Sequence, residues 1–140
     1  MSRPNGRLGL LRSLGAALGG YAAIIVATTL GFTPLGGIIH LSAPLRVHAL
    51  ATVVAIVSGI LGGMVAGWIG GRFPVRHALG AAACVVIESS LIIGLRRGTD
   101  PLWFEVLGAA TLVLATVSGG YLWGSLRRQP GKSIATASRS

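Results

Sequence analysis

Charge is scarce in this chain, and acidic charge is the scarcest. Of its 140 residues, 11% are charged and only three are acidic, whereas about a quarter of the residues in an average soluble domain carry a charge. A soluble domain of this size has a large exposed surface that polar groups must cover. Because 52% of the residues are hydrophobic and long runs hold no charge, the composition excludes an ordinary water-soluble fold and indicates lipid as the solvent.

Cysteine pairs and the usual catalytic signatures are also missing. Cys84 is alone, so no disulfide forms within the chain. The sequence has no CxxC pair, no Cys and His cluster at metal-ligand spacing, and no GxGxxG, Walker or GxSxG motif. His40, His48 and His77 fall near segment ends and do not pair at one depth to hold a haem. We therefore expect no enzymatic activity, no metal and no cofactor.

Positive charge, in contrast, is in excess, with a formal net charge of +9. Such an excess is typical of proteins that neutralise nucleic-acid phosphates. The basic residues here, however, sit at the ends of hydrophobic runs or in the terminal tails. This placement indicates contact with a membrane surface, so we expect the lipid bilayer rather than nucleic acid to be the partner.

Four apolar segments are about long enough to cross a bilayer as helices, which takes about 20 residues. They cover residues 14–33, 47–71, 77–95 and 101–126. Asp100 as N-cap and Pro101 in the first turn are expected to begin the last helix. The links are short, and short links favour antiparallel neighbours. We predict an all-α fold: an integral membrane four-helix bundle over residues 1–128, running up-down-up-down, with a disordered basic tail over 129–140.

Orientation follows from the Lys and Arg residues in alternate links and tails. One side collects nine of them and the other collects three, namely Arg46, Arg96 and Arg97. We predict a multi-pass protein of a bacterial cytoplasmic membrane with both termini in the cytoplasm. The first segment could instead be a cleaved signal peptide. Its apolar part is about 20 residues, longer than the usual 7 to 15 of a signal peptide, which favours an uncleaved helix.

The second segment carries glycine at every fourth position. Gly59, Gly63, Gly67 and Gly71 make three overlapping GxxxG motifs, the pattern that lets helices approach closely in lipid. We expect a partner helix to lie in this groove, either from the same chain, from a second copy in a homodimer, or from a membrane partner subunit. Val54 and Ile60 are expected to face lipid.

Residues 62–80 read GGMVAGWIGGRFPVRHALG. A helix ending with a Gly-Gly pair, a turn with basic residues and proline, and a His-Ala-Leu start to the next helix together resemble the central hairpin of small uncharacterised bacterial four-helix membrane proteins. The residues that fit are Arg72, Pro74, Arg76, His77, Ala78 and Leu79. The resemblance implies an integral membrane protein and carries no catalytic residue.

Glu88 is the most costly residue of the third segment. A charged acid at the centre of a spanning helix costs about 2.5 to 3.5 kcal/mol, so we expect Glu88 to be neutral and to face the interior. Its helix stripe includes Cys84 and His77. We predict an intramembrane polar cluster of Glu88, Ser58, Tyr21, His77 and Thr116.

Two functions are compatible with these features. The favoured one is a non-enzymatic structural or interaction subunit that packs through the glycine-rich second helix. The alternative is a small proton-coupled transporter or channel that uses the buried Glu88. No residue pattern in the sequence names a substrate or a partner.

Overall fold

The computed structural model describes residues 6–37, 39–95 and 100–128, and these residues form a helical protein. Its four α-helices are α1 (Gly6–Phe32), α2 (Leu45–Gly70), α3 (Pro74–Leu95) and α4 (Leu102–Arg127), with a short 3-10 turn η1 (Thr33–Leu35) after α1. No strand occurs in these ranges. The predicted all-α class is confirmed.

All four helices are long enough and apolar enough to cross a membrane. The shortest, α3, has 22 residues, which at 1.5 Å per residue gives a helix of about 33 Å, slightly longer than a typical hydrocarbon core. The chain therefore has the architecture of a multi-pass membrane protein, as its composition predicts.

The helix boundaries differ from the predicted ones mainly at the N-terminal ends. α1 begins at Gly6 rather than near Leu14, because Arg12 and the leucines around it are good helix formers. α3 begins at Pro74 rather than at His77, since proline suits the first turn of a helix. Asp100 is not the N-cap of α4. Pro101 takes that position, with no side-chain cap. The predicted tail over 129–140 lies outside the described residues.

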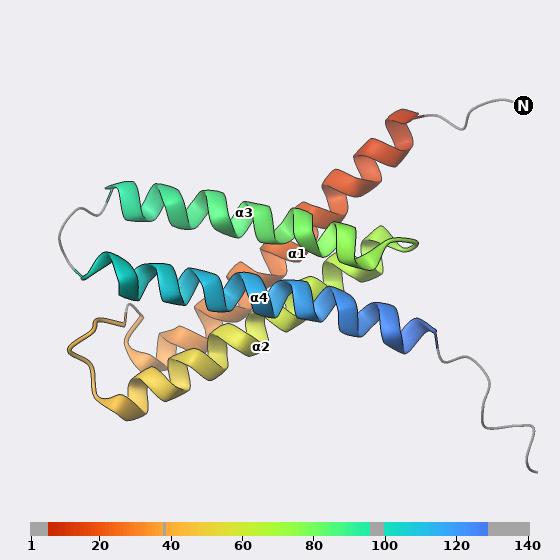
Figure 1. Ribbon diagram of the computed structural model, residues 1–140. Coiled ribbons are helices and arrows are strands. Elements are labelled where there is room, and N and C mark those ends of the chain that lie inside the picture. Colours follow the sequence, from red (N-terminus) through yellow and green to blue (C-terminus); the bar gives the residue numbers. More distant parts are fainter. Residues whose placement is uncertain (1–5, 38, 96–99, 129–140) are drawn as a thin grey trace, which may run out of the picture.

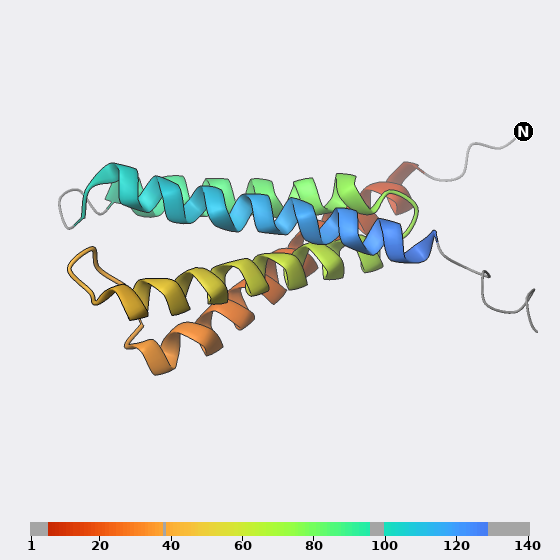
Figure 2. The same ribbon diagram turned by 60° about the horizontal axis from the view of Figure 1, so that its bottom comes forward.

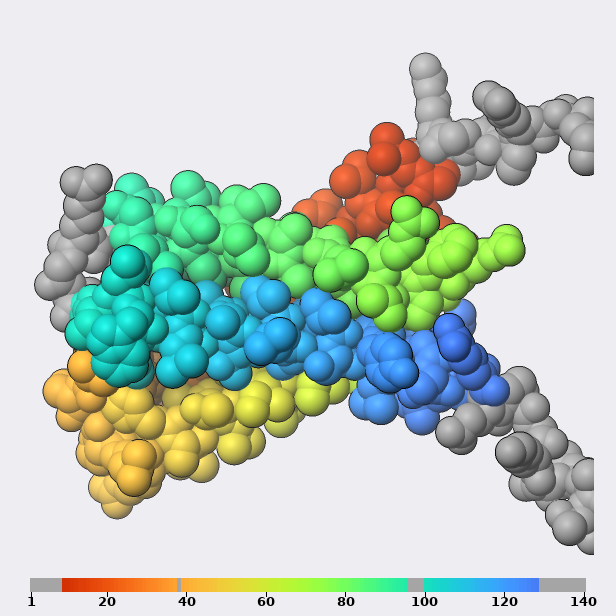
Figure 3. All heavy atoms as spheres, in the orientation of Figure 1, coloured from red at the N-terminus to blue at the C-terminus, as the bar shows by residue number. Residues whose placement is uncertain are grey.

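The helices form two layers (Figures 1 and 2). α3 and α4 lie in one layer and α2 in the other; the second half of α1 lies beside α2, and its first half crosses to pack on α3 as well. The layers meet at the end where α1 begins and α4 ends, which is called the terminal end below. They separate toward the opposite end, where α1 joins α2 and α3 joins α4, which is called the link end. The first turns of α1 project beyond the body of the bundle at the terminal end (Figure 3).

The interior consists mostly of small side chains. Among the buried apolar residues that the structure describes, only Ile24 and Val85 are larger than alanine; the others are Ala16, Ala66, Ala78, Ala81, Ala82 and Ala115. Large apolar side chains lie on the outside, including Leu18, Leu61 and Trp68. In water such a surface would be unfavourable, but in lipid it is the solvated face, and close packing of small residues holds the helices together.

Candidate functional site

The glycine row of α2 lies against α4. A methyl group added at Gly59 would come within 2.6 Å of the Ala115 Cβ, and one added at Gly63 would collide with the backbone carbonyl of Thr116. Gly67 lies against Pro74 and the Trp123 ring. The partner helix in this groove therefore belongs to the same chain.

A second small-residue row on α2 faces the other neighbours. Gly62 lies against Gly20 and Ile24 of α1, and Gly70 against the His77 ring of α3. α2 is thus packed on two faces through residues that lack a bulky side chain. This arrangement allows its backbone to approach α1 and α4 closely.

Two details predicted for the second helix are wrong. Gly71 is not part of the helix: it follows the last residue of α2 with a φ of 75°, a left-handed conformation that favours glycine, and faces the Arg12 guanidinium. Val54 does not face lipid, because its side chain lies against Gly31 of α1. Ile60 is partly exposed, and its backbone lies against Gly119 of α4.

Glu88 lies near one of its predicted partners. The Tyr21 hydroxyl on α1 is close enough to the Glu88 carboxyl on α3 for the two groups to interact electrostatically, and Cys84, one turn along α3, is near the same hydroxyl. Both Tyr21 and Glu88 are half-buried. α1 and α3 thus bring two titratable side chains together inside the spanning part of the bundle.

Ser58 is buried at the level of Glu88. Its side chain is only 2% exposed, on the row of α2 that continues into Gly62. Gly70 of α2 lies against His77 of α3, so these two residues are at the same level. Ser58 precedes Gly70 by twelve residues and Glu88 follows His77 by eleven, and because the two helices are antiparallel, both residues lie a similar distance from that contact. The structure shows no hydrogen bond that joins the two side chains, so they share a level rather than a contact.

Thr116 and His77 lie away from Glu88. The Thr116 hydroxyl donates to the Leu112 carbonyl, 2.8 Å away in its own helix, and its backbone packs on Gly63. His77 is at the other end of α3, eleven residues or about 16 Å from Glu88. Its Nδ1 donates to the Phe73 carbonyl at 2.7 Å, and its Nε2 accepts from the Ser13 hydroxyl at 3.3 Å. The predicted five-residue cluster is therefore divided among three places.

A cavity opens where the two layers separate. It has a volume of about 580 Å³, is lined by residues of all four helices, and lies at the link end of the bundle. Its wall is mainly apolar, with Phe32, Phe104 and Ile92 among the lining residues, but Ser89 and Thr111 add hydroxyls and Glu105 adds a carboxylate. A mostly apolar chamber with a few polar groups is typical of a small-molecule site.

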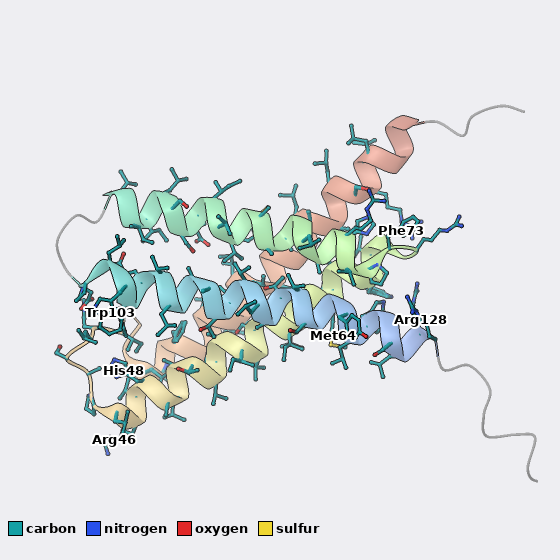
Figure 4. All side chains as sticks on the ribbon, in the orientation of Figure 1. Arg46, His48, Met64, Phe73, Trp103 and Arg128 are labelled. Atoms are coloured by element: carbon teal, nitrogen blue, oxygen red, sulfur yellow. The ribbon has the colours of Figure 1, made fainter. Side chains whose placement is uncertain are left out.

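His48 lines this cavity and also carries a buried, unsatisfied nitrogen. Its ring reaches from the first turns of α2 toward the start of α4, where Trp103 lies (Figure 4), and meets the Phe104 ring edge-on at 5.5 Å. Nδ1 is 3.3 Å from the Pro44 carbonyl, which only accepts, so Nδ1 carries the hydrogen. The buried Nε2 has no partner among the described residues and is the acceptor in the neutral ring.

Asp100 forms two hydrogen bonds at the edge of the cavity. One carboxylate oxygen accepts from His40 Nδ1 at 3.0 Å and the other from the Leu41 backbone N–H at 3.1 Å. The α1–α2 link is thereby tied to the start of α4. Sequence reasoning missed both this tie and the cavity, because the residues involved are far apart in the chain and form no local pattern.

Comparison with known proteins adds no relative. No family model matches the chain, and no curated protein or solved structure matches it. Within the described residues, no group of three or more His, Cys, Asp or Glu side chains could hold a metal ion.

Proposed function

We propose that this protein is a small non-enzymatic transporter or channel of a bacterial cytoplasmic membrane, in which the cavity admits a solute and Glu88 exchanges a proton. Its helices cross the membrane up-down-up-down with both termini in the cytoplasm. The cavity then opens on the outer side. The observation that carries the proposal is that the cavity is lined by Ser89, next to Glu88 on α3, and by Ile92, one turn further along.

The distance between the cavity and the acid is short. Ile92 lines the cavity and follows Glu88 by one helical turn, a rise of about 6 Å. Of the three acidic residues in the chain, Glu88 is the one in the middle of a spanning helix, whereas Asp100 and Glu105 lie at the start of α4. An acid at this depth is expensive for a purely structural role, and such residues mark proton and ion paths in membrane proteins.

The proposed membrane position is supported by the aromatic residues at the helix ends. Phe73, in the turn between α2 and α3, and Trp103, at the start of α4, lie at opposite ends of the bundle (Figure 4). Both are at least half exposed. Aromatic rings at both ends of a spanning bundle are typical of the two membrane–water interfaces.

The other expected function, a subunit that recruits a partner through the glycine row, has less support. Gly59 and Gly63 already lie against Ala115 and Thr116 of α4. A homodimer or partner subunit docking on this row would first have to displace α4. Such a subunit would therefore have to use a lipid-facing surface that carries large side chains.

Cysteine labelling tests the cavity. In a Cys84→Ala background, single cysteines replace Ala55 and Thr111, which line the cavity, and Val53, which is 56% exposed toward lipid. A membrane-impermeant maleimide added to intact cells should label the cavity cysteines and leave Val53→Cys unlabelled, because lipid excludes the reagent. Equal labelling of all three positions would show that no water-filled cavity distinguishes Ala55 and Thr111 from Val53. Labelling of the cavity cysteines only after permeabilisation would show that the cavity opens on the cytoplasmic side.

Proton movement tests the role of Glu88. The purified chain in liposomes with a pH-sensitive dye inside is given a potassium diffusion potential, with and without a panel of small solutes outside. Wild-type protein should carry protons faster than empty liposomes under at least one condition, and Glu88→Gln should abolish the difference. Ser90→Ala, at an exposed position of α3 that does not line the cavity, is the matched control. Unchanged flux in Glu88→Gln would reject proton exchange at this residue.

A further inference from the structure

The terminal end of the bundle carries a cluster of arginines fixed around the end of α2. Arg12 of α1 donates from Nε to the Ile69 carbonyl at 3.1 Å, and Arg127 of α4 donates from Nη1 to the Gly71 carbonyl at 3.2 Å. Guanidinium groups from two different helices are thus held on the last carbonyls of a third. These bonds satisfy backbone acceptors, but they leave both positive charges in place.

Two more arginines lie beside the same turn. The guanidinium carbons of Arg72 and Arg76 lie 5.7 and 5.5 Å from the centre of the Phe73 ring, so both are held close to one aromatic side chain. Arg128, in the residue after α4, is exposed at this end as well (Figure 4). The arginine cluster therefore comprises Arg12, Arg72, Arg76, Arg127 and Arg128.

No acidic side chain among the described residues lies at this end to balance the charge. The three acidic residues are Glu88, in the middle of α3, and Asp100 and Glu105, at the opposite end of the bundle. Guanidinium groups gathered at one end of the bundle repel one another, and an anion among them lowers that repulsion. A phosphate group from outside the protein would supply such an anion.

An apolar groove lies on the same part of the molecule. It has a volume of about 440 Å³ and is lined by Ile60, Val75, Val117, Ser118, Tyr121 and Leu122. Val75 is next to Arg76 in the chain, and Leu122 is about one turn before Arg127. A molecule with an anionic head and an apolar tail would match both the arginine cluster and this groove.

We propose that the arginine cluster binds the phosphate headgroup of an anionic phospholipid, with an acyl chain in the groove of Val75 and Leu122. Guanidinium groups bind phosphate oxygens through paired hydrogen bonds. Basic pockets between spanning helices are known binding sites for anionic lipid headgroups. The inference depends on the helices spanning a membrane, but it does not depend on the cavity or on the transport function proposed above.

The test uses the full-length chain purified in a neutral detergent. Added phosphatidylglycerol should raise the Tm, whereas phosphatidylcholine at the same concentration should not, and native mass spectrometry should show retained phosphatidylglycerol. The double variant Arg72→Gln/Arg76→Gln should lower retention roughly tenfold, since each basic residue near an anionic headgroup contributes several-fold. Neither side chain bonds the backbone of α2 within the described residues, so the variant should fold.

Arg46→Gln is the matched control, because it removes an exposed arginine from the link end. It should leave phosphatidylglycerol retention unchanged. An equal loss in Arg46→Gln would overturn the proposal, because it would show attraction by net charge alone. Equal effects of phosphatidylcholine would overturn it too. A Tm rise with inorganic phosphate as large as that with phosphatidylglycerol would assign the cluster to a soluble anion instead of a lipid.

Discussion

At the residue scale, Glu88 and Tyr21 carry the most chemical information. Their side chains come from helices that are far apart in the chain, and they meet inside the part of the bundle that crosses the membrane. A hydrogen bond between helices in lipid contributes about 0.6 kcal/mol on average, less than is often assumed, because the separated helices find other partners. The pair is therefore a weak structural tie and a better candidate for function.

The first prediction concerns the coupling of these two side chains. Glu88→Gln keeps a donor and an acceptor for Tyr21, so the free energy of unfolding should change by less than about 0.5 kcal/mol. Glu88→Leu should lose about 0.5 to 1 kcal/mol, and so should Tyr21→Phe. The two losses should not add in the double variant. Unfolding in mixed micelles measures all four proteins, and full additivity would mean that the side chains do not interact.

The second prediction concerns His48, whose Nε2 has no partner in the described structure. His48→Phe keeps a flat ring against Phe104 and removes the unsatisfied nitrogen, so it should stabilise the protein or leave it unchanged, by at most about 1 kcal/mol. A large loss of stability would show that Nε2 already has a hydrogen-bond partner outside the described residues.

At the scale of the elements, α2 organises the bundle. One of its faces meets α4 through Gly59 and Gly63, and another meets α1 through Gly62. The atoms that lie opposite these glycines belong to the backbone as often as to a side chain. Backbone atoms cannot move aside as the end of a flexible side chain does. A helix packed in this way tolerates no added volume on either face.

The third prediction follows from this packing. Gly63→Leu would drive a side chain into the Thr116 carbonyl and should destabilise the protein by about 3 kcal/mol or prevent folding. Gly15→Leu is the matched control, because a Cβ at Gly15 meets nothing within 4 Å. It should be neutral or slightly stabilising, since leucine favours a helix more than glycine does. Detergent stability measures both, and similar results would mean that α2 and α4 are not packed here.

At the scale of the whole molecule, the placement of basic residues sets the orientation. Arg12, Arg72, Arg76, Arg127 and Arg128 gather at the terminal end, whereas Arg46 lies at the link end. The fourth prediction is that both termini face the cytoplasm. Alkaline phosphatase fused after Ser140 should be inactive and a fluorescent protein at the same place should be bright. An active phosphatase at that position would show that the topology is the opposite of the predicted one and that the cavity opens on the inner side.

The sequence was sufficient to predict the helices but not how they pair. Apolar runs of membrane-spanning length identify all four helices because each run reflects local composition. The glycine spacing predicts a close contact, yet nothing in it indicates that α4 rather than a second copy fills the groove. Counting residues along each helix places Glu88 at the level of Tyr21 but also at the level of Thr116, because such a count takes all helices as parallel and starting at the same height. The true levels depend on contacts such as that of Gly120 with Ala78.

The two layers of the bundle meet at one end and separate at the other, and this asymmetry has a mechanical consequence. The glycine contacts between α2 and α4 reach from the closed end as far as Gly59, so the free part of α2 runs from Leu45 to Gly59. This part is about 21 Å long, so a tilt of about 5° would move its far end by about 2 Å. A small rocking of one layer against the other would therefore change the width of the open end by about 2 Å while the packed part hardly moves.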